Sequence, residues 1–367
     1  FGQNRSLPKR ENYRRELNLG NGISTTSWSW EGITFTREVF ATAPDNVIVI
    51  RLTCSQPGRL TFKISLSREQ DAVVVPASED ELLMTGQIVD LPDKDVCPPG
   101  LHMKFAARLW GRVKDGSLRS VNNSLFAENA SEALLYLTAA TDYNPSLLNF
   151  DRNIDPAAIC ARILEPVRYK TYEEVKQKHI ADHSALFDRV KFSLGEDKMR
   201  DLPTDQRLKL VREGAEDPGL AVLQFQYGRY LLMGSSRKPG ILPANLQGIW
   251  NQDYSAAWNS DFHTNINIQM NYWPAEVCNL PETVIPLSDL INRLREPGRV
   301  TAQKTFNSTG WTVNHLTDPF GRTSISDGVG WGTFPMAGPW LVLHQWEHFL
   351  FTQDMEYLRN EAWPSMK

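Results

Sequence analysis

The sequence has little cysteine, no long apolar run and little net charge. Its 367 residues contain four scattered cysteines and no Cys-x-x-Cys pair: Cys54, Cys97, Cys160 and Cys278. That pattern excludes a dense disulfide framework and gives no zinc or redox signature. No stretch approaches the roughly 18 apolar residues of a membrane-spanning helix. A net charge of −4 provides no attraction to nucleic acid or an anionic membrane. We therefore expect no nucleic-acid partner, no membrane span, no metal and no cofactor.

Aromatic residues, in contrast, are plentiful, with eleven tryptophans and sixteen phenylalanines. Such side chains fill a large core, and their flat faces also stack on the C–H faces of sugar rings. Hydrophobic residues make up 41% and charged residues 22%, which is typical of a folded globular protein.

The first 140 or so residues have the two-residue period of β-strands. Between Arg59 and Ser67, apolar residues alternate with polar ones, which predicts a half-buried strand. Residues Ile33–Phe40, Asn46–Cys54 and Ala133–Ala140 are also strand-like. Several short strands separated by turn residues favour a β-sandwich. We predict an incomplete sandwich domain over residues 1–143.

From about residue 155 the period becomes helical. A capping box, Thr171-x-x-Glu174, starts one helix, and residues 144–200 are predicted to form a helical linker. A second helix is predicted over Leu220–Met233, with Leu220, Leu223, Tyr227 and Leu231 along one stripe. Further helices are predicted over 271–280, 287–295 and 340–350, separated by long loops. Loops of such length in a compact domain are usually functional.

The loop residues between 242 and 276 combine side-chain amides with aromatic rings. The amides are Asn245, Gln247, Asn265, Asn267, Gln269 and Asn271, and His263 and Trp258 lie among them. An amide offers both a donor and an acceptor, which suits a neutral polyol. Asn265 and Asn267 are two residues apart, so both would point to one side of an extended segment. The alternative is that these amides satisfy the backbone of the loop.

Two runs in this region resemble a known family. Asn245–Trp250 (NLQGIW) and His263–Glu276 (HTNINIQMNYWPAE) are similar to the signature of glycoside hydrolase family 95, the 1,2-α-L-fucosidases, and weaker matches extend over nearly the whole chain. The resemblance implies an N-terminal β domain, a helical linker, an (α/α)6 barrel and a C-terminal β domain. Residues 201–367 would then form the first part of the barrel. The remaining segment of the same polypeptide would complete it.

The same resemblance implies a reaction and a set of roles. Family members cleave with inversion and use two asparagines, here Asn265 and Asn267, to hold and polarise the attacking water. His263 matches the residue near the C5 methyl of fucose, and the general acid would lie beyond Lys367. The substrate would be a fucosylated oligosaccharide or glycan with an α-1,2 linkage. The resemblance also favours a periplasmic or secreted bacterial enzyme. On residue type alone, Asn245 and Gln247 are candidate sugar ligands, and Trp258 and Trp331 are a candidate stacking platform.

Other functions remain open at this stage. An α-L-galactosidase of the same family and a non-catalytic carbohydrate-binding fragment both fit the amide and aromatic cluster. His344-x-x-Glu347-His348 matches the pattern of inverted zinc peptidases, and Glu347 is an alternative catalytic carboxyl. His315 and Asp318 are expected to organise the loop around them.

Overall fold

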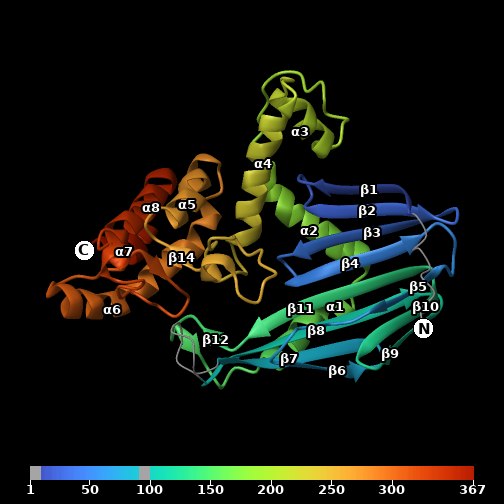
Figure 1. Ribbon diagram of the computed structural model, residues 1–367, viewed down its shortest axis with the longest axis horizontal. Coiled ribbons are helices and arrows are strands. Elements are labelled where there is room, and N and C mark those ends of the chain that lie inside the picture. Colours follow the sequence, from blue (N-terminus) through green and yellow to red (C-terminus); the bar gives the residue numbers. More distant parts are fainter. Residues whose placement is uncertain (1–9, 91–99) are drawn as a thin grey trace. The chain divides into compact units, whose positions relative to one another are not determined.

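The computed structural model describes residues 10–90 and 100–367 (Figure 1). The chain forms two compact units, Phe1–Ser184 and Ala185–Lys367. The two-part architecture predicted from the change of period, sheet first and helices second, is confirmed. Cys54, Cys160 and Cys278 are free thiols, and Cys97 lies outside the described residues. Among the helices described, none is long and apolar enough to cross a membrane.

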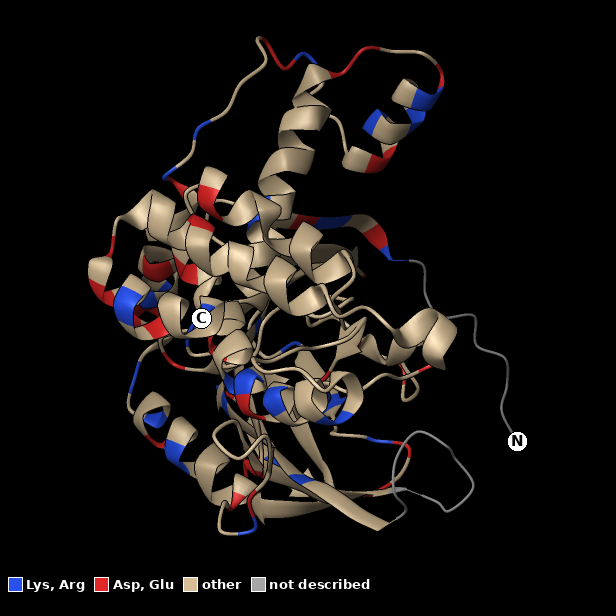
Figure 2. Ribbon diagram, turned by 90° about the vertical axis from the view of Figure 1, so that its left-hand side faces the viewer, with Lys and Arg blue, Asp and Glu red and all other residues tan. Residues whose placement is uncertain are grey.

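The first unit is built on an eight-stranded antiparallel sheet with the order β1-β2-β3-β4-β11-β8-β7-β6. Its strands are β1 (Glu11–Asn18), β2 (Ile23–Trp30), β3 (Ile33–Thr42), β4 (Val47–Cys54), β6 (Ala72–Ser78), β7 (Glu81–Asp90), β8 (Gly100–Lys114) and β11 (Glu132–Thr141). The edge strand β1 is exposed along its whole length and carries charges of both signs (Figure 2). Such charges discourage pairing with another chain.

One face of this sheet is partly covered by a three-stranded sheet of β5 (Leu60–Ile64), β9 (Ser117–Val121) and β10 (Ser124–Ala130). Leu82, Leu109 and Leu135 of the large sheet pack there with Leu125 of β10, and all four are nearly inaccessible to solvent. Two further short strands, β12 (Tyr143–Asn144) and β13 (Asn149–Phe150), pair with each other. The predicted strands over 33–40, 46–54, 59–67 and 133–140 correspond to β3, β4, β5 and β11.

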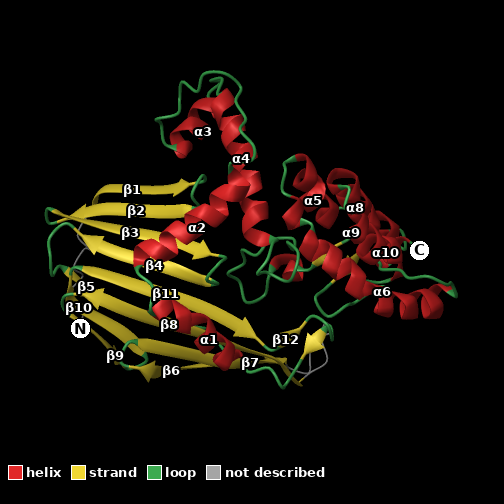
Figure 3. Cartoon of the chain, turned by 180° about the vertical axis from the view of Figure 1, so that it is seen from behind, coloured by secondary structure: helices red, strands yellow, loops and turns green. Residues whose placement is uncertain are grey.

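Helices α1 (Pro156–Arg168) and α2 (Tyr172–Phe187) cross the opposite face of the large sheet (Figure 3). Leu164 and Val175 of these helices pack against Val49 and Tyr136 of the sheet. The sheet is therefore sandwiched between a small sheet and two helices, which the strand pattern alone did not predict. Both helices lie within the predicted linker of 144–200.

The predicted capping box at the start of α2 is present. The Thr171 backbone N–H donates to Glu174 Oε2 at 2.7 Å, and the Glu174 N–H donates to Thr171 Oγ1 at 3.2 Å. Two of the four N–H groups that a helix start leaves without partners are thus satisfied.

The second unit is helical. Its main helices are α3 (Thr204–Arg212), α4 (Pro218–Ser235), α5 (Asn267–Val277), α6 (Ile285–Phe306) and α8 (Ala337–Thr352), with the short α7 (Val329–Gly332), α9 (Met355–Tyr357) and α10 (Trp363–Met366). The core lies between α5, α6 and α8, where Tyr272, Leu287, Ile291 and Leu341 are fully buried. The predicted helices over 220–233, 271–280, 287–295 and 340–350 are confirmed with somewhat different ends.

The predicted apolar stripe of α4 is wrong. Tyr227 is exposed and Leu220, Leu223 and Leu231 are only half-buried. The residues of α4 that are buried are Gly219, Arg229, Leu232 and Met233. The buried face is rotated because Met233 packs against Leu186 and Leu280, and because the Arg229 guanidinium donates to the backbone carbonyls of Leu186, Phe187 and Cys278.

Candidate functional site

Asn265 and Asn267 lie on a turn between a short strand and a helix. Strand β14 (Phe262–His263) pairs with β15 (Leu316–Thr317), and the turn 264–266 then leads into α5, which begins at Asn267. The expectation of an extended segment is therefore corrected. Residue Asn267 already belongs to the first turn of α5, so the two-residue alternation of a strand does not apply here.

Buried hydrogen bonds fix this turn through its first residue. Thr264 is fully buried; its N–H donates to the His315 carbonyl at 2.8 Å, and its hydroxyl donates to the Asn314 carbonyl. The Gln269 amide, also fully buried, donates to the Thr264 carbonyl at 2.6 Å. The backbone beside Asn265 is therefore held from both sides by groups that have no contact with solvent.

The side-chain amides of Asn265 and Asn267 are available to bind a ligand. Asn265 is exposed and Asn267 is half-buried. Within residues 10–90 and 100–367, neither side-chain amide has a hydrogen-bond partner. Each can therefore offer a carbonyl oxygen and an NH₂ group to a ligand or to a water molecule.

The two other predicted amide ligands are partly engaged within the protein. Asn245 Oδ1 accepts the Gln247 N–H at 2.7 Å, and Asn245 exchanges two backbone hydrogen bonds with Gly248. The Gln247 side-chain oxygen accepts the Ser260 hydroxyl. Both amides thus use one acceptor position of their oxygens to organise the loop.

His263 is held by a buried carboxylate. Its Nδ1 lies 2.6 Å from Asp261 Oδ1, and Asp261 is only 6% exposed. Arg322 Nη2 lies 3.5 Å from the other oxygen, Asp261 Oδ2. Burial raises the pKa of Asp261 above its usual value, and the hydrogen bond from His263 and the charge of Arg322 oppose that rise.

Two aromatic rings set the plane of the His263 imidazole. The indole of Trp258 and the ring of His315 both meet it edge to face, with centroids at 5.9 and 6.1 Å. His315 in turn pairs with Asp327 at 3.0 Å. The sequence had marked His263 and His315 but not their carboxylate partners. A local signal for the first pair was the spacing of Asp261 and His263, which are two residues apart at the start of β14.

Both predicted stacking residues are exposed. Trp258 is 76% exposed and Trp331, on α7, is 86% exposed. Trp258, Asn259 and Ser260 all have positive φ, between 48° and 56°. Three successive non-glycine residues in this conformation store strain, which functional sites often contain. The Ser260–Gln247 hydrogen bond helps to hold the segment in place.

Asp318 organises its loop, as expected. Asp318 Oδ1 accepts the backbone N–H groups of Phe320 and Arg322 at 2.9 and 3.2 Å, and Asp318 Oδ2 lies 3.2 Å from Arg322 Nε. Arg322 therefore bridges Asp318 and Asp261.

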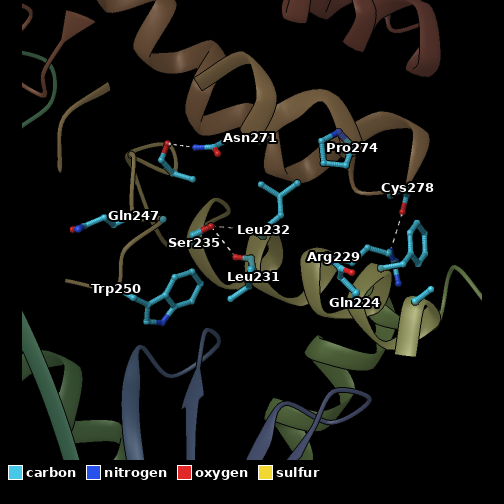
Figure 4. Close-up of a pocket in the computed structure, with 15 residues that line it drawn as sticks. Gln224, Arg229, Leu231, Leu232, Ser235, Gln247, Trp250, Asn271, Pro274 and Cys278 are labelled. Carbon is cyan, nitrogen blue, oxygen red and sulfur yellow. Dashed lines mark hydrogen bonds between the residues drawn. The ribbon is translucent and has the colours of Figure 1, made fainter. Parts of the chain in front are cut away.

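The helical unit also contains a pocket of about 600 Å³ (Figure 4). It is lined by α4, α5 and the 244–250 loop, including Trp250, Gln247 and Asn271. The Asn271 amide donates to the Asn245 carbonyl at 3.1 Å. Because Asn265, Asn267 and His263 are not among its lining residues, the pocket does not define the candidate site.

The two histidines of the zinc-peptidase pattern, His344 and His348, are buried. His348 Nδ1 lies 2.6 Å from Glu276 Oε1, and both side chains are buried. Burial lowers the pKa of His344 to about 4. Burial, and then the charge of Glu276, raises the pKa of Glu347. In the described part of the chain, no group of three or more His, Cys, Asp or Glu side chains is placed to hold a metal ion.

Free amides, a carboxylate-held histidine and exposed tryptophans, following a sheet-rich unit in the sequence, are typical of proteins that act on carbohydrates. Comparison with known families agrees with that class. Residues 171–367 match the catalytic domain of glycosyl hydrolase family 95, and residues 4–146 match the N-terminal domain of glycosyl hydrolase family 65. Because the catalytic-domain match covers more than half of the sequence, this chain belongs to glycosyl hydrolase family 95.

Curated relatives and a solved structure extend the comparison. The chain is 36% identical to "Alpha-L-fucosidase 2" of Arabidopsis thaliana, over 97% of this chain and 44% of that protein. It is 30% identical to "Probable alpha-fucosidase A" of Aspergillus niger, over 97% of this chain and 45% of that protein. The chain thus spans about half the length of the curated relatives it matches.

The solved structure is of a protein assigned as a kojibiose phosphorylase from the human microbiome. It aligns with a TM-score of 0.61, covering 98% of this chain and 45% of that one at 12% identity. At that identity the likeness concerns the fold alone.

Proposed function

We propose that this chain is part of an inverting α-L-fucosidase that cleaves α-1,2-linked fucose from oligosaccharides or glycans. The names of the fucosidase relatives support the substrate class. The observation that carries the assignment within this chain is the pair of uncommitted amides at Asn265 and Asn267, on a turn fixed by buried hydrogen bonds. A non-catalytic sugar-binding role would not require two free amides on so rigid a support.

In the proposed reaction, Asn265 and Asn267 hold the water that attacks the anomeric carbon. An amide oxygen accepts a hydrogen bond from the water and orients its lone pair, although an amide is too weak a base to take the proton away. The proton passes to a carboxylate in the rest of the polypeptide. A second carboxyl there protonates the departing glycosidic oxygen, as inversion requires an acid and a base on opposite faces of the sugar.

The start of α5 favours this chemistry. Asn267 is the first residue of the helix, and the backbone N–H groups of a first helical turn have no partners within the helix. Together they make the helix start slightly positive. The oxygen of the attacking water gains negative character as its proton leaves, so a position near this helix start stabilises it.

The helical unit is proposed to be the first part of an (α/α)6 barrel. Helices α4, α5, α6 and α8 would supply its early helices, and the remaining segment of the same polypeptide would supply the others together with the general acid. His263 would lie near the C5 methyl of fucose, and Trp258 and Trp331 would stack on the sugar or on the group attached to it.

The test uses the whole polypeptide that contains these 367 residues. It is incubated with lactose fucosylated through an α-1,2 or an α-1,3 linkage, and the first product is followed by proton NMR. We expect faster cleavage of the α-1,2 isomer and initial release of the β-anomer. Release of the α-anomer first would refute inversion. Equal or better cleavage of an α-L-galactoside would point to the galactosidase alternative, and sugar binding without cleavage would point to a binding module.

A further inference from the structure

We infer that Asp261 is a positioning residue that fixes the tautomer of His263, so that the Nε2 edge of the imidazole faces the ligand as a hydrogen-bond acceptor. This inference rests on the proposed function, because it needs His263 to contact the sugar. It goes further by giving a role to a buried carboxylate and by naming the chemistry that His263 presents, namely acceptance of a sugar hydroxyl.

The geometry leaves one arrangement of protons for a neutral imidazole. Asp261 Oδ1 is 2.6 Å from His263 Nδ1, and a carboxylate can only accept, so the proton is on Nδ1. Nε2 then keeps its lone pair. Within the part of the chain that the structure describes, Nε2 has no hydrogen-bond partner, and it is not among the buried polar atoms that lack one. It is therefore open to a ligand.

Asp261 is in turn held as an acceptor from its other side. Arg322 Nη2 lies 3.5 Å from Oδ2, and a guanidinium has donors only. Asp318, 3.2 Å from Arg322 Nε, keeps Arg322 in place. Both oxygens of Asp261 thus face donors, and the carboxylate cannot turn to serve another partner.

Because of this arrangement, the isosteric substitution D261N should change the tautomer of His263. In D261N the amide oxygen should turn to Arg322, since that residue needs an acceptor. The amide NH₂ must then face His263 Nδ1, which forces the proton onto Nε2 and turns the ligand-facing acceptor into a donor. D261A imposes no tautomer, so a fraction of the molecules keeps the correct one. D261N, the more conservative substitution, should therefore reduce activity more than D261A does.

The experiment measures kcat/KM of the whole enzyme on the α-1,2-fucosyl substrate, with thermal unfolding of every variant. We expect losses of about 10²-fold for D261N and about 10-fold for D261A, the range typical of losing a carboxylate that orients a functional histidine. Adding R322M to D261N frees the amide to turn its oxygen to His263 and should recover activity. E282Q is the matched control, because it neutralises a carboxylate that pairs with another arginine, Arg189, and contacts neither Arg322 nor His263, and it should stay within about 3-fold of wild type.

The outcomes separate the inference from the proposed function. If D261N is as active as D261A or more so, Asp261 only fills its site and the inference is overturned, while fucoside cleavage by the wild type still stands. A wild-type enzyme that cleaves no fucoside overturns both. If D261N does not fold, D261A and R322M decide: equal losses would mean that only the Asp261–Arg322 ion pair matters, whereas a loss confined to D261A supports the inference.

Discussion

Replacing Asn265 or Asn267 by Ala should reduce catalysis without reducing stability. Neither side chain has a hydrogen-bond partner in the described residues, and neither is fully buried. Truncation therefore removes no internal interaction, and the free energy of unfolding should change by no more than about 0.5 kcal/mol. Loss of a group that orients the reacting water should lower kcat by about 10²- to 10³-fold, or roughly 3 to 4 kcal/mol of transition-state stabilisation.

The assay compares kcat, KM and melting temperature for N265A, N267A and the double variant. Because the proposed role places both amides on one water, the double variant should be little worse than either single one. N267D should also be impaired, since a carboxylate there lacks the NH₂ donor and adds a negative charge. N271A is the matched control: it loses the 3.1 Å hydrogen bond to Asn245 and should cost about 1 kcal/mol of stability.

Two results would contradict the proposed role of Asn265 and Asn267. Turnover at wild-type rate by both Ala variants would remove these residues from the site. Loss of stability with a normal kcat per folded molecule would mean that the amides only support the loop.

The remaining predictions concern specificity and pH. H263T should narrow the preference for an α-L-fucoside over the matching α-L-galactoside by about 10-fold or more; unchanged ratios of kcat/KM would refute the role of His263. Burial lowers the pKa of His344 from 6.5 to about 4. The neutral imidazole is therefore buried without a protonation cost above pH 6.5, and the free energy of unfolding decreases as the pH falls from 6.5 towards 4. Urea unfolding should show that the free energy of unfolding decreases by on the order of 2 kcal/mol between pH 7 and pH 5 because of His344. The H344L variant should not show this decrease. Burial alone would raise the pKa of Glu38, but hydrogen bonds from Lys176 and Tyr172 outweigh that effect and lower it; stability should therefore fall as pH drops below about 4.5, and E38Q should reduce this acid sensitivity.

Local patterns predicted the elements of this fold well. The alternation from Leu60 to Ile64 marks β5, whose inner face packs on the large sheet. The capping box at Thr171 marks the start of α2 because both of its hydrogen bonds are made within four residues. Such signals need no information from distant parts of the chain.

Contacts between residues far apart along the chain could not be predicted from the sequence. The buried face of α4 depends on Leu186 and Leu280, which are far from it along the chain. The turn at Asn265 depends on the pairing of β14 with β15, and those strands are about fifty residues apart. A run that looks extended by itself becomes a turn because the hydrogen bonds to Asn314 and His315 bend it into α5.

The six candidate amide side chains of this region, which the sequence pattern could not tell apart, make different hydrogen bonds in the structure. Asn245, Gln247 and Asn271 each use a side-chain group to hold the loop, and Gln269 holds the turn from inside. Among these six amides, only those of Asn265 and Asn267 have no hydrogen-bond partner at either end within residues 10–90 and 100–367. A hydrogen-bonded amide must first break that bond before it can hold a substrate or a water molecule, whereas a free amide on a rigid turn needs no such rearrangement. For that reason we propose the catalytic role for these two residues, and a supporting role in the loop for the other four.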